Sequence, residues 1–355
     1  SLERVLITLG HQEPDRVPLF LLLTMHGAKE LGLSIESYFS RATHVVQGQI
    51  KLLEKYEHDC IYNFYHAPLE VEAWGAEVIY CVDGPPNTGR PFIEKIQDIQ
   101  TLEPPSIENS DGLARVLTSA RLLKETVKDQ VPIIGVVMSP FSLPVMQLGF
   151  DRYIELIYES PSLFQRLMDI NIKFCTALAN AQLAAGSTAI CYFDPVSSPT
   201  IIPRELYLKT GFKVAKQTLS QINGPTATHL ASGRGLGIVD DLAATGTAIM
   251  GTSSLEDLAR VKAACRGKLT VLGNLNGIEM CNWTPDQAED AVKKAIAAAG
   301  PGGGYLLAEN ELYSTGLALE YMKEDFGVYT RRTEMNPFFE KCRTNHGGTG
   351  TPRTV

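Results

Sequence analysis

Short apolar runs recur along the chain, and each is followed by a stretch whose apolar positions are spaced as in a helix. The runs are rich in β-branched and other apolar residues and occupy residues 17–23, 59–64, 131–138, 188–193, 226–231, 248–251, 269–274 and 304–308. Alternating strands and helices are typical of a parallel sheet with crossover helices. Eight such units predict an α/β fold, a closed (β/α)8 TIM barrel rather than an open doubly wound sheet.

Signals at helix ends support this register. Thr284, Pro285 and Gln287 supply an N-cap, a proline at the first helical position and the partner residue of a capping box. The glycine-rich stretch 300–304 ends this helix, because glycine accepts positive φ and proline cannot continue the helical hydrogen bonds. The chain then enters the last predicted strand.

A long segment, residues 70–123, separates the second and third predicted strands. Its turn residues at 83–86 indicate a hairpin or lid, and an insertion at this place in a barrel lies on the catalytic face. We expect a single barrel domain over residues 1–340, with residues 70–123 as an excursion over its mouth. Residues 341–355 are polar and glycine-rich, which predicts a flexible C-terminal tail.

Composition narrows the class of protein. The 355 residues are 44% hydrophobic and 20% charged, as in a globular chain with a core of its own. A formal net charge of −8 without any Lys/Arg run argues against nucleic acid or a membrane surface as partner. No secretory signal pattern opens the chain, so we expect a cytoplasmic protein. The seven cysteines are scattered without CxxC spacing, which argues against disulfides and a zinc ribbon.

Five motifs, by their order and spacing, resemble the uroporphyrinogen decarboxylase superfamily over nearly the whole chain. They are Asp15-Arg16-Val17-Pro18, Glu72-Ala73-Trp74-Gly75-Ala76-Glu77-Val78, Tyr192-Phe193-Asp194-Pro195, Gly273-Asn274-Leu275-Asn276 and Gly302-Gly303-Gly304-Tyr305-Leu306-Leu307. The superfamily includes the decarboxylase of haem synthesis and the corrinoid-dependent methyltransferases. The resemblance implies a barrel whose active site lies at the C-terminal ends of the strands.

The chain departs from the decarboxylase pattern at the positions that bind the substrate. That pattern has arginines just after the first strand and an aspartate after the second. Here apolar residues run from Phe20 to Leu23, and His66 aligns with the aspartate. An apolar mouth on an acidic protein is a poor binder for a polyanion, because each carboxylate needs a partner in a partly dehydrated site. The haem-pathway reaction is therefore not expected.

The methyltransferase pattern is kept in part. It has a His-x-Cys pair after the fifth strand and a further Cys after the eighth, which together bind zinc. Here the first reads His229-Leu230-Ala231 and the second Glu309-Asn310-Glu311. A histidine with carboxylates makes a harder Lewis acid than thiolates do, and such a site suits an oxygen leaving group. The resemblance thus implies zinc on His229 and Glu311, with Glu309 as a further ligand.

The expected function is methyl transfer from a small methylated compound, in its concrete form a methoxylated aromatic, to the cobalt of a corrinoid on a separate small protein. For catalysis we name His229, Glu311 and Asp194, although an Asp-Pro pair is also a common turn. The pocket is expected to contain little arginine, and its substrate-binding residues are predicted to be Met25, His26, Tyr65, His66, Tyr192 and Asn274.

Alternatives stay open. One is a divergent decarboxylase of a smaller acid, and another is a non-catalytic barrel that binds a corrinoid or tetrapyrrole. The stretch Gly233 to Gly237 weakly resembles an anion-binding loop, which would suit a corrinoid tail. A homodimer is also compatible with the sequence.

Overall fold

This computed structural model describes residues 1–82 and 84–309. Its elements are α1 (Leu2–Leu9), α2 (His26–Leu31), α3 (Ile35–Phe39), α4 (Ala42–Tyr56), β1 (Ile61–Asn63), α5 (Leu69–Glu72), β2 (Val78–Ile79), β3 (Asn87–Thr88), the 3-10 helix η1 (Ile96–Gln100), α6 (Asp111–Val127), β4 (Ile133–Met138), α7 (Pro144–Leu148), α8 (Phe150–Glu159), α9 (Pro161–Ala185), β5 (Ala189–Phe193), η2 (Pro195–Ser197), α10 (Arg204–Lys209), α11 (Gly211–Leu219), β6 (Thr226–His229), η3 (Leu236–Ile238), α12 (Val239–Ala244), β7 (Ile249–Gly251), α13 (Leu258–Cys265), β8 (Thr270–Leu275), α14 (Gly277–Met280), α15 (Pro285–Ala299) and β9 (Tyr305–Glu309).

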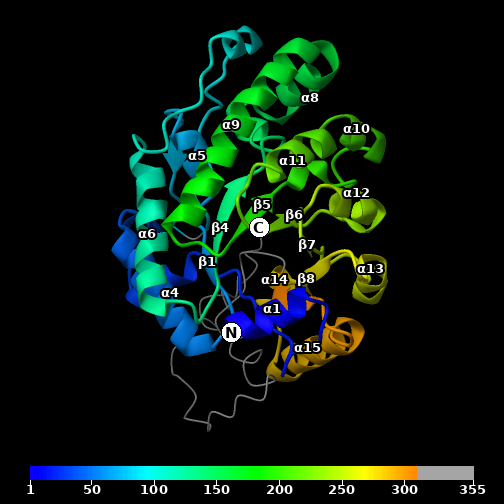
Figure 1. Cartoon of the computed structure of the whole chain (residues 1–355). Coiled ribbons are helices and arrows are strands. Elements are labelled where there is room, and N and C mark those ends of the chain that lie inside the picture. The colour runs from blue at the N-terminus through cyan, green and yellow to red at the C-terminus, as the bar shows by residue number, and fades with distance from the viewer. Residues whose placement is uncertain (83, 310–355) are drawn as a thin grey trace, which may run out of the picture.

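Seven strands form one parallel sheet in the order β1-β4-β5-β6-β7-β8-β9. They follow one another around the centre of the molecule, and the crossover helices cover the outside (Figure 1). Seven of the eight predicted strands therefore coincide with observed ones. The predicted capping box at Thr284 is also confirmed, since its hydroxyl accepts from the Gln287 amide and α15 begins at Pro285. The predicted tail, residues 341–355, and the end of the domain at 340 lie outside the described residues.

The first predicted strand, residues 17–23, is an extended segment with a single β-bridge, Leu19 to Leu307. It lies between β9 and β1, because the Phe20 amide donates to the Leu307 carbonyl (2.8 Å) and the Asp59 amide donates to the Leu19 carbonyl (2.7 Å). It is not a regular strand because side-chain carboxyls take its amides. Asp59 Oδ2 accepts from Leu19 N (2.8 Å), and Glu309 Oε1 accepts from Leu22 N (2.6 Å).

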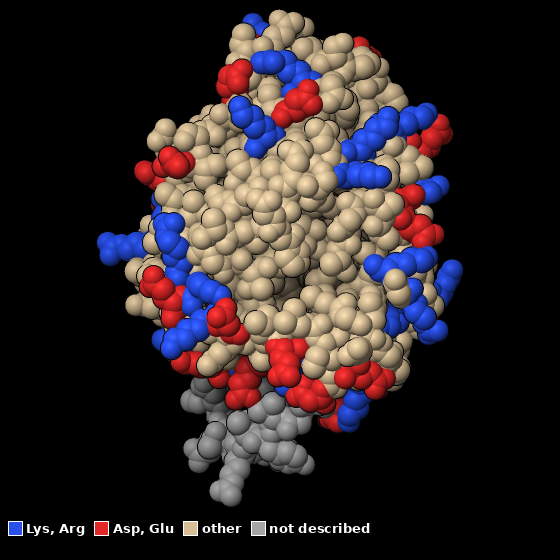
Figure 2. All heavy atoms as spheres, in the orientation of Figure 1, with Lys and Arg blue, Asp and Glu red and all other residues tan. Residues whose placement is uncertain are grey.

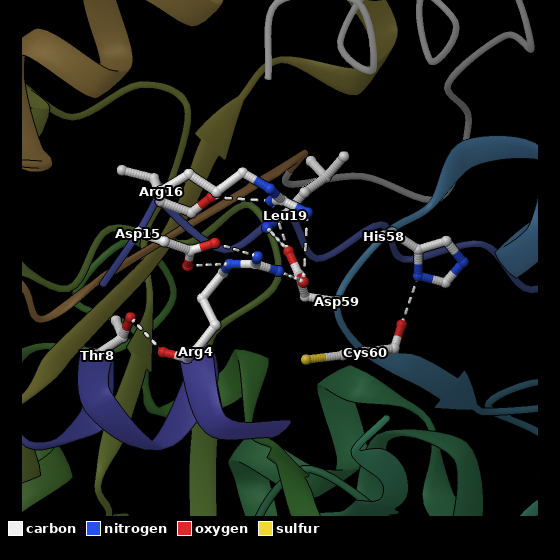
Figure 3. Close-up of polar contacts among 9 residues, drawn as sticks. Arg4, Thr8, Asp15, Arg16, Leu19, His58, Asp59 and Cys60 are labelled. Atoms are coloured by element: carbon white, nitrogen blue, oxygen red, sulfur yellow. Dashed lines mark hydrogen bonds and ion pairs between the residues drawn. The ribbon is translucent and has the colours of Figure 1, made fainter. Parts of the chain in front are cut away.

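A buried carboxylate fixes this segment at the N-terminal end of β1 (Figure 3). The Asp59 side chain is completely buried and pairs with Arg4 of α1 (2.5 Å) and with Arg16 (2.7 Å). Arg4 also binds Asp15, and this hydrogen bond lowers the pKa of Asp15 to about 2. Because a buried charge needs such partners, the network ties α1, residues 15–19 and β1 together.

The concave face of the sheet, which is turned away from the helices, is apolar. Every second residue of a strand points to this face, and these residues form one cluster: Phe20, Leu22, Cys60, Tyr62, Val136, Cys191, Leu272, Leu306 and Ala308. The intervening positions pack against the helices in two larger clusters. This two-sided burial explains why the strands read as nearly continuous apolar runs.

The excursion predicted at 70–123 is shorter than expected. Its last part is α6, the ordinary crossover helix between β1 and β4, so the inserted segment is the chain between α5 and α6. The predicted hairpin is present, as the antiparallel pair β2 and β3. The segment, cyan in Figure 1, lies beside α7 and α8. The Ile93 amide donates to the Gln147 carbonyl of α7, and Arg152 of α8 donates to the Glu94 carbonyl.

No helix in the described ranges is both long and apolar enough to cross a membrane. On the face that Figure 2 shows, charged side chains of both signs lie mostly toward the edge, and the centre is largely uncharged. That face carries no broad basic patch of the kind that binds nucleic acid.

Candidate functional site at the strand ends

His229 is the last residue of β6 and is buried. Its ring stacks on Phe193 of β5, with centroids 5.5 Å apart, and packs on Gly251 of β7, where a Cβ would come within 2.4 Å of the ring. Burial lowers the pKa of His229 to about 4, so the ring is neutral at pH 7. Nδ1 accepts from the Ala231 amide (3.0 Å), which places the ring hydrogen on Nε2.

Asp194 follows β5 and is also buried. Its Oδ1 accepts hydrogen bonds from the hydroxyls of Ser139 (2.5 Å) and Ser142 (2.7 Å), and its amide donates to the His229 carbonyl (2.8 Å). Burial raises its pKa, and the serine hydroxyls act against that shift. These contacts join the loop after β4 to the end of β6, and the catalytic role expected for Asp194 stays a prediction.

Glu309 ends β9 and is almost completely buried. Oε1 accepts from the Leu22 amide, whereas Oε2 has no hydrogen-bond partner within the described chain. Burial raises the pKa of Glu309 to about 8, so the carboxyl is mostly protonated at neutral pH. A buried carboxylic acid with a free oxygen can donate a proton to a bound substrate.

Glu70 of α5 is a second buried carboxyl with a raised pKa, and the sequence did not single it out. It is buried, and Oε1 accepts from the amide of Met138 at the end of β4 (2.6 Å). Its Oε2 has no partner among the described residues, and burial raises its pKa to about 8. The available signal was a glutamate between two apolar residues, Leu69 and Val71, just after a predicted strand.

The six predicted substrate-binding residues do not form one group. Tyr192 is fully buried on the helix-facing side of β5, so it does not open into the barrel interior. Asn274 donates to the carbonyls of Ser253 (2.9 Å) and Glu256 (3.0 Å) and so ties β8 to the loop after β7.

The other four lie after residues 17–23 and after β1. Met25 and His26 begin α2 and are partly exposed. Tyr65 stacks on Phe39 and donates to the Arg115 carbonyl (3.2 Å), and the buried His66 packs edge-on against Phe39. Two surface hollows, of about 360 and 310 Å³, are lined by none of the six predicted residues.

The metal-ligand side chains among residues 1–82 and 84–309 do not by themselves form the expected zinc site. Glu311 lies outside the described residues, so its pairing with His229 cannot be placed. Within residues 1–82 and 84–309, no group of three His, Cys, Asp or Glu side chains is arranged to hold a metal ion. The neutral His229 also has its Nδ1 occupied and its hydrogen on Nε2, which is not the form that binds a metal.

The fold and these strand-end groups define an α/β protein of the parallel, barrel-like class with its polar site at the C-terminal ends of the strands. Residues 1–309 match the family model described as uroporphyrinogen decarboxylase (URO-D). The chain belongs to this family.

Relatives within the family have two different names. The chain is 22% identical over 308 residues to a methylcobamide:CoM methyltransferase of Methanosarcina mazei, covering 83% of this chain and 88% of the relative. It is 26% identical over 328 residues to a uroporphyrinogen decarboxylase of Xanthomonas campestris pv. campestris, covering 85% and 89%. A solved methyltransferase from Methanosarcina mazei shares the fold, with a TM-score of 0.78, 18% identity and coverage of 92% and 98%.

Proposed function

We propose that this protein is a corrinoid-dependent methyltransferase that moves a methyl group from a small methylated compound, preferably a methoxylated aromatic, to the cobalt of a corrinoid on a partner protein. The observation that carries the proposal is Glu309, a protonated carboxyl with a free oxygen at the end of β9. The methyltransferase relatives supply the reaction class.

The reaction needs a proton donor at the leaving oxygen. Cobalt(I) supplies the electron pair that forms the new cobalt–carbon bond, while the carbon–oxygen bond breaks and the oxygen keeps its electrons. The products are methylcobalt(III) and a phenol once a proton reaches that oxygen. Glu309 is the acid that we assign to this step, and we assign the Nε2–H of His229, a hydrogen that the Ala231 contact keeps there, to a hydrogen bond with the substrate.

Zinc on His229, Glu311 and Glu309 is the metal-assisted form of the same proposal. The ion would supply Lewis-acid polarisation of the leaving oxygen. His229 would then have to give up the hydrogen that its contact with Ala231 keeps on Nε2. Elemental analysis of the purified protein, followed by activity before and after metal removal, separates this form from the carboxyl form.

Decarboxylation is the second candidate function, favoured by the family match and by relatives of that name. The strand-end groups support it less, because a polycarboxylate requires several cations. Arg16, the arginine nearest the first predicted strand, is committed to Asp59 at the opposite end of the sheet. Release of carbon dioxide from a small acid would favour this alternative over methyl transfer.

The partner protein has to bring its cobalt to the strand ends, and exposed apolar side chains surround that side. Phe150, Ile201, Leu255 and Ile278 are exposed and follow β4, β5, β7 and β8. The C-terminal ends of parallel strands share one edge of the sheet, so we expect these four residues to form an apolar rim around the site. We assign the rim to the corrinoid-carrying partner.

Two variants of equal exposure test this assignment. Ile278 and Leu6 are each 57% exposed. Leu6 lies on α1 at the other end of the sheet, because the Leu2 amide at the start of α1 donates to the carbonyl of Gln130, just before β4 begins. We expect I278E to slow methyl transfer to a purified small corrinoid-binding protein at least tenfold and to leave transfer to free cob(I)alamin unchanged. The control L6E should change neither rate.

Equal loss with free cob(I)alamin would mean that Ile278 serves the chemistry, and an unchanged rate with the corrinoid protein would remove the rim from the docking surface. If sedimentation shows that I278E instead dissociates a dimer, the rim is a contact between copies of this chain.

A further inference from the structure

Three buried polar atoms without hydrogen-bond partners in the described chain belong to residues that interact with Tyr80, the residue after β2. They are Nδ1 of His66, Oε2 of Glu72 and Nε of Arg115, from the loop after β1, α5 and α6. The Tyr80 ring packs edge-on against His66, and its hydroxyl lies 3.5 Å from His66 Nε2. Buried polar atoms in native proteins are nearly always satisfied by protein, water or a ligand, so these three atoms are available to a water molecule or a bound group.

His66, Glu72 and Tyr80 each interact electrostatically with Arg115. We call these four residues the Arg115 cluster. The charge of Arg115 acts on the pKa of the other three. None of the ion pairs among the described residues joins Arg115 to a carboxylate, although the charge of Arg115 acts to lower the pKa of Glu72. Burial is the main cause of the raised pKa of Glu72, which further weakens it as a counter-ion.

Arg115 also reaches a hollow that a small molecule can enter. The hollow has a volume of about 310 Å³ and is lined by Ala42, Asp111, Ala114, Arg115 and Thr118. Ala42 and Asp111 are the first residues of α4 and α6, so two helix N-termini with their partial positive charges border it. Asp111 is the acidic side chain that faces the hollow, and it is exposed to solvent.

The free atoms in the cluster are mainly donors. His66 is neutral at pH 7, because burial lowers its pKa to about 4. When the Tyr80 hydroxyl donates to Nε2, the ring hydrogen lies on Nδ1, which is then a donor without an acceptor. The Nε–H of Arg115 is a second such donor and carries positive charge. Two N–H donors beside an uncompensated cation suit an oxyanion.

We propose that Arg115, with the cluster behind it, binds a small oxyanion, a carboxylate or a phosphate, in the hollow that the N-terminal ends of α4 and α6 border. This site is separate from the strand-end groups His229 and Glu309 and does not depend on the methyl-transfer proposal. The anion would give Arg115 the ion-pair partner that the described residues do not supply.

Calorimetric titration of the full chain with benzoate, acetate and inorganic phosphate at pH 7 tests the site, each as a separate probe. We expect saturable binding of at least one probe, with R115Q weakening it about tenfold to a hundredfold, the effect of losing one or two charge-assisted hydrogen bonds. R121Q, on the same helix, changes a neighbour of the hollow because Arg121 donates to Thr118, so it should weaken binding less than R115Q does; the matched control is R260Q, at an exposed arginine of α13. It should bind as the parent does.

Preference among the three probes distinguishes a carboxylate site from a phosphate site. The proposal is overturned if the parent protein binds none of them, or if R115Q and R260Q bind equally well. Should R115Q fail to fold, R115K decides: it keeps the charge but lacks the Nε–H, so it should bind at least several-fold more weakly than the parent, and equal binding would overturn the proposal.

Discussion

Replacing Glu309 with glutamine should stabilise the protein, and increasingly so as the pH rises. The carboxyl is buried, and its pKa rises from an ordinary 4.5 to about 8. At pH 7 the unfolded chain ionises this group while the folded chain keeps it protonated. Between the ordinary pKa of 4.5 and pH 7, each pH unit lowers the free energy of unfolding by about 1.4 kcal/mol. At pH 7 the protonated carboxyl therefore costs the folded state about 3 kcal/mol.

The sign follows from the raised pKa. A group that is harder to ionise in the folded state costs nothing below pH 4.5, and its cost grows until the pH passes about 8. Glutamine does not titrate, so E309Q removes the dependence and keeps an oxygen to accept from the Leu22 amide. The free energy of unfolding by urea, measured from pH 5 to pH 8.5, should show parent and variant diverging steadily.

Two further variants serve as controls. E70Q should behave like E309Q, because burial raises the pKa of Glu70 to the same value. E205Q should not, because Glu205 is exposed and its hydrogen bond to Lys209 lowers its pKa. A difference between E309Q and the parent that stays constant with pH would refute the protonated carboxyl and, with it, the acid that we assign to methyl transfer.

The remaining predictions concern positioning. D59N should lower the free energy of unfolding by about 3 kcal/mol in urea titrations, because it leaves Arg4 and Arg16 without their buried carboxylate; an unchanged midpoint would contradict the network. G251A should displace the His229 ring, which lies within 2.4 Å of the added methyl group, and reduce methyl transfer at least tenfold. G237A, with open space around it, should retain full activity, and equal effects of the two would argue against the importance of the ring's position. H229A should abolish methyl transfer and also lower the free energy of unfolding by about 2 kcal/mol, because the ring is buried against Phe193 and Gly251; full activity would exclude the histidine from the site.

The sequence predicts the sheet well because burial on both faces leaves an apolar run for each strand. It fails at residues 17–23 for a specific reason: the run is apolar, but Asp59 and Glu309 occupy two of its amides, and no local pattern reveals side chains that lie 40 and 287 residues away. Tyr192 was misplaced because alternation along a short strand does not by itself show which face lies inside. Glu70 was missed because its partner, the Met138 amide, comes from a distant strand end.

The candidate site was predicted only at the positions that the family resemblance marks. His229 was expected at a strand end and lies there, but its tautomer depends on the Ala231 amide, which sequence does not show. The Arg115 cluster was not expected: of its members the sequence singled out only His66, and it assigned that residue to the substrate pocket. Its other members come from α5, the hairpin and α6, and only the folded chain brings them together.

The most direct test of methyl transfer is the visible spectrum of cob(I)alamin mixed with the purified protein and a panel of methoxylated aromatic compounds. The account predicts that at least one compound converts cob(I)alamin to methylcobalamin at a rate proportional to protein concentration, and that E309Q lowers this rate at least a hundredfold, the usual scale of a lost acid catalyst. No methylation with any compound, together with carbon dioxide release from a small acid, would contradict it.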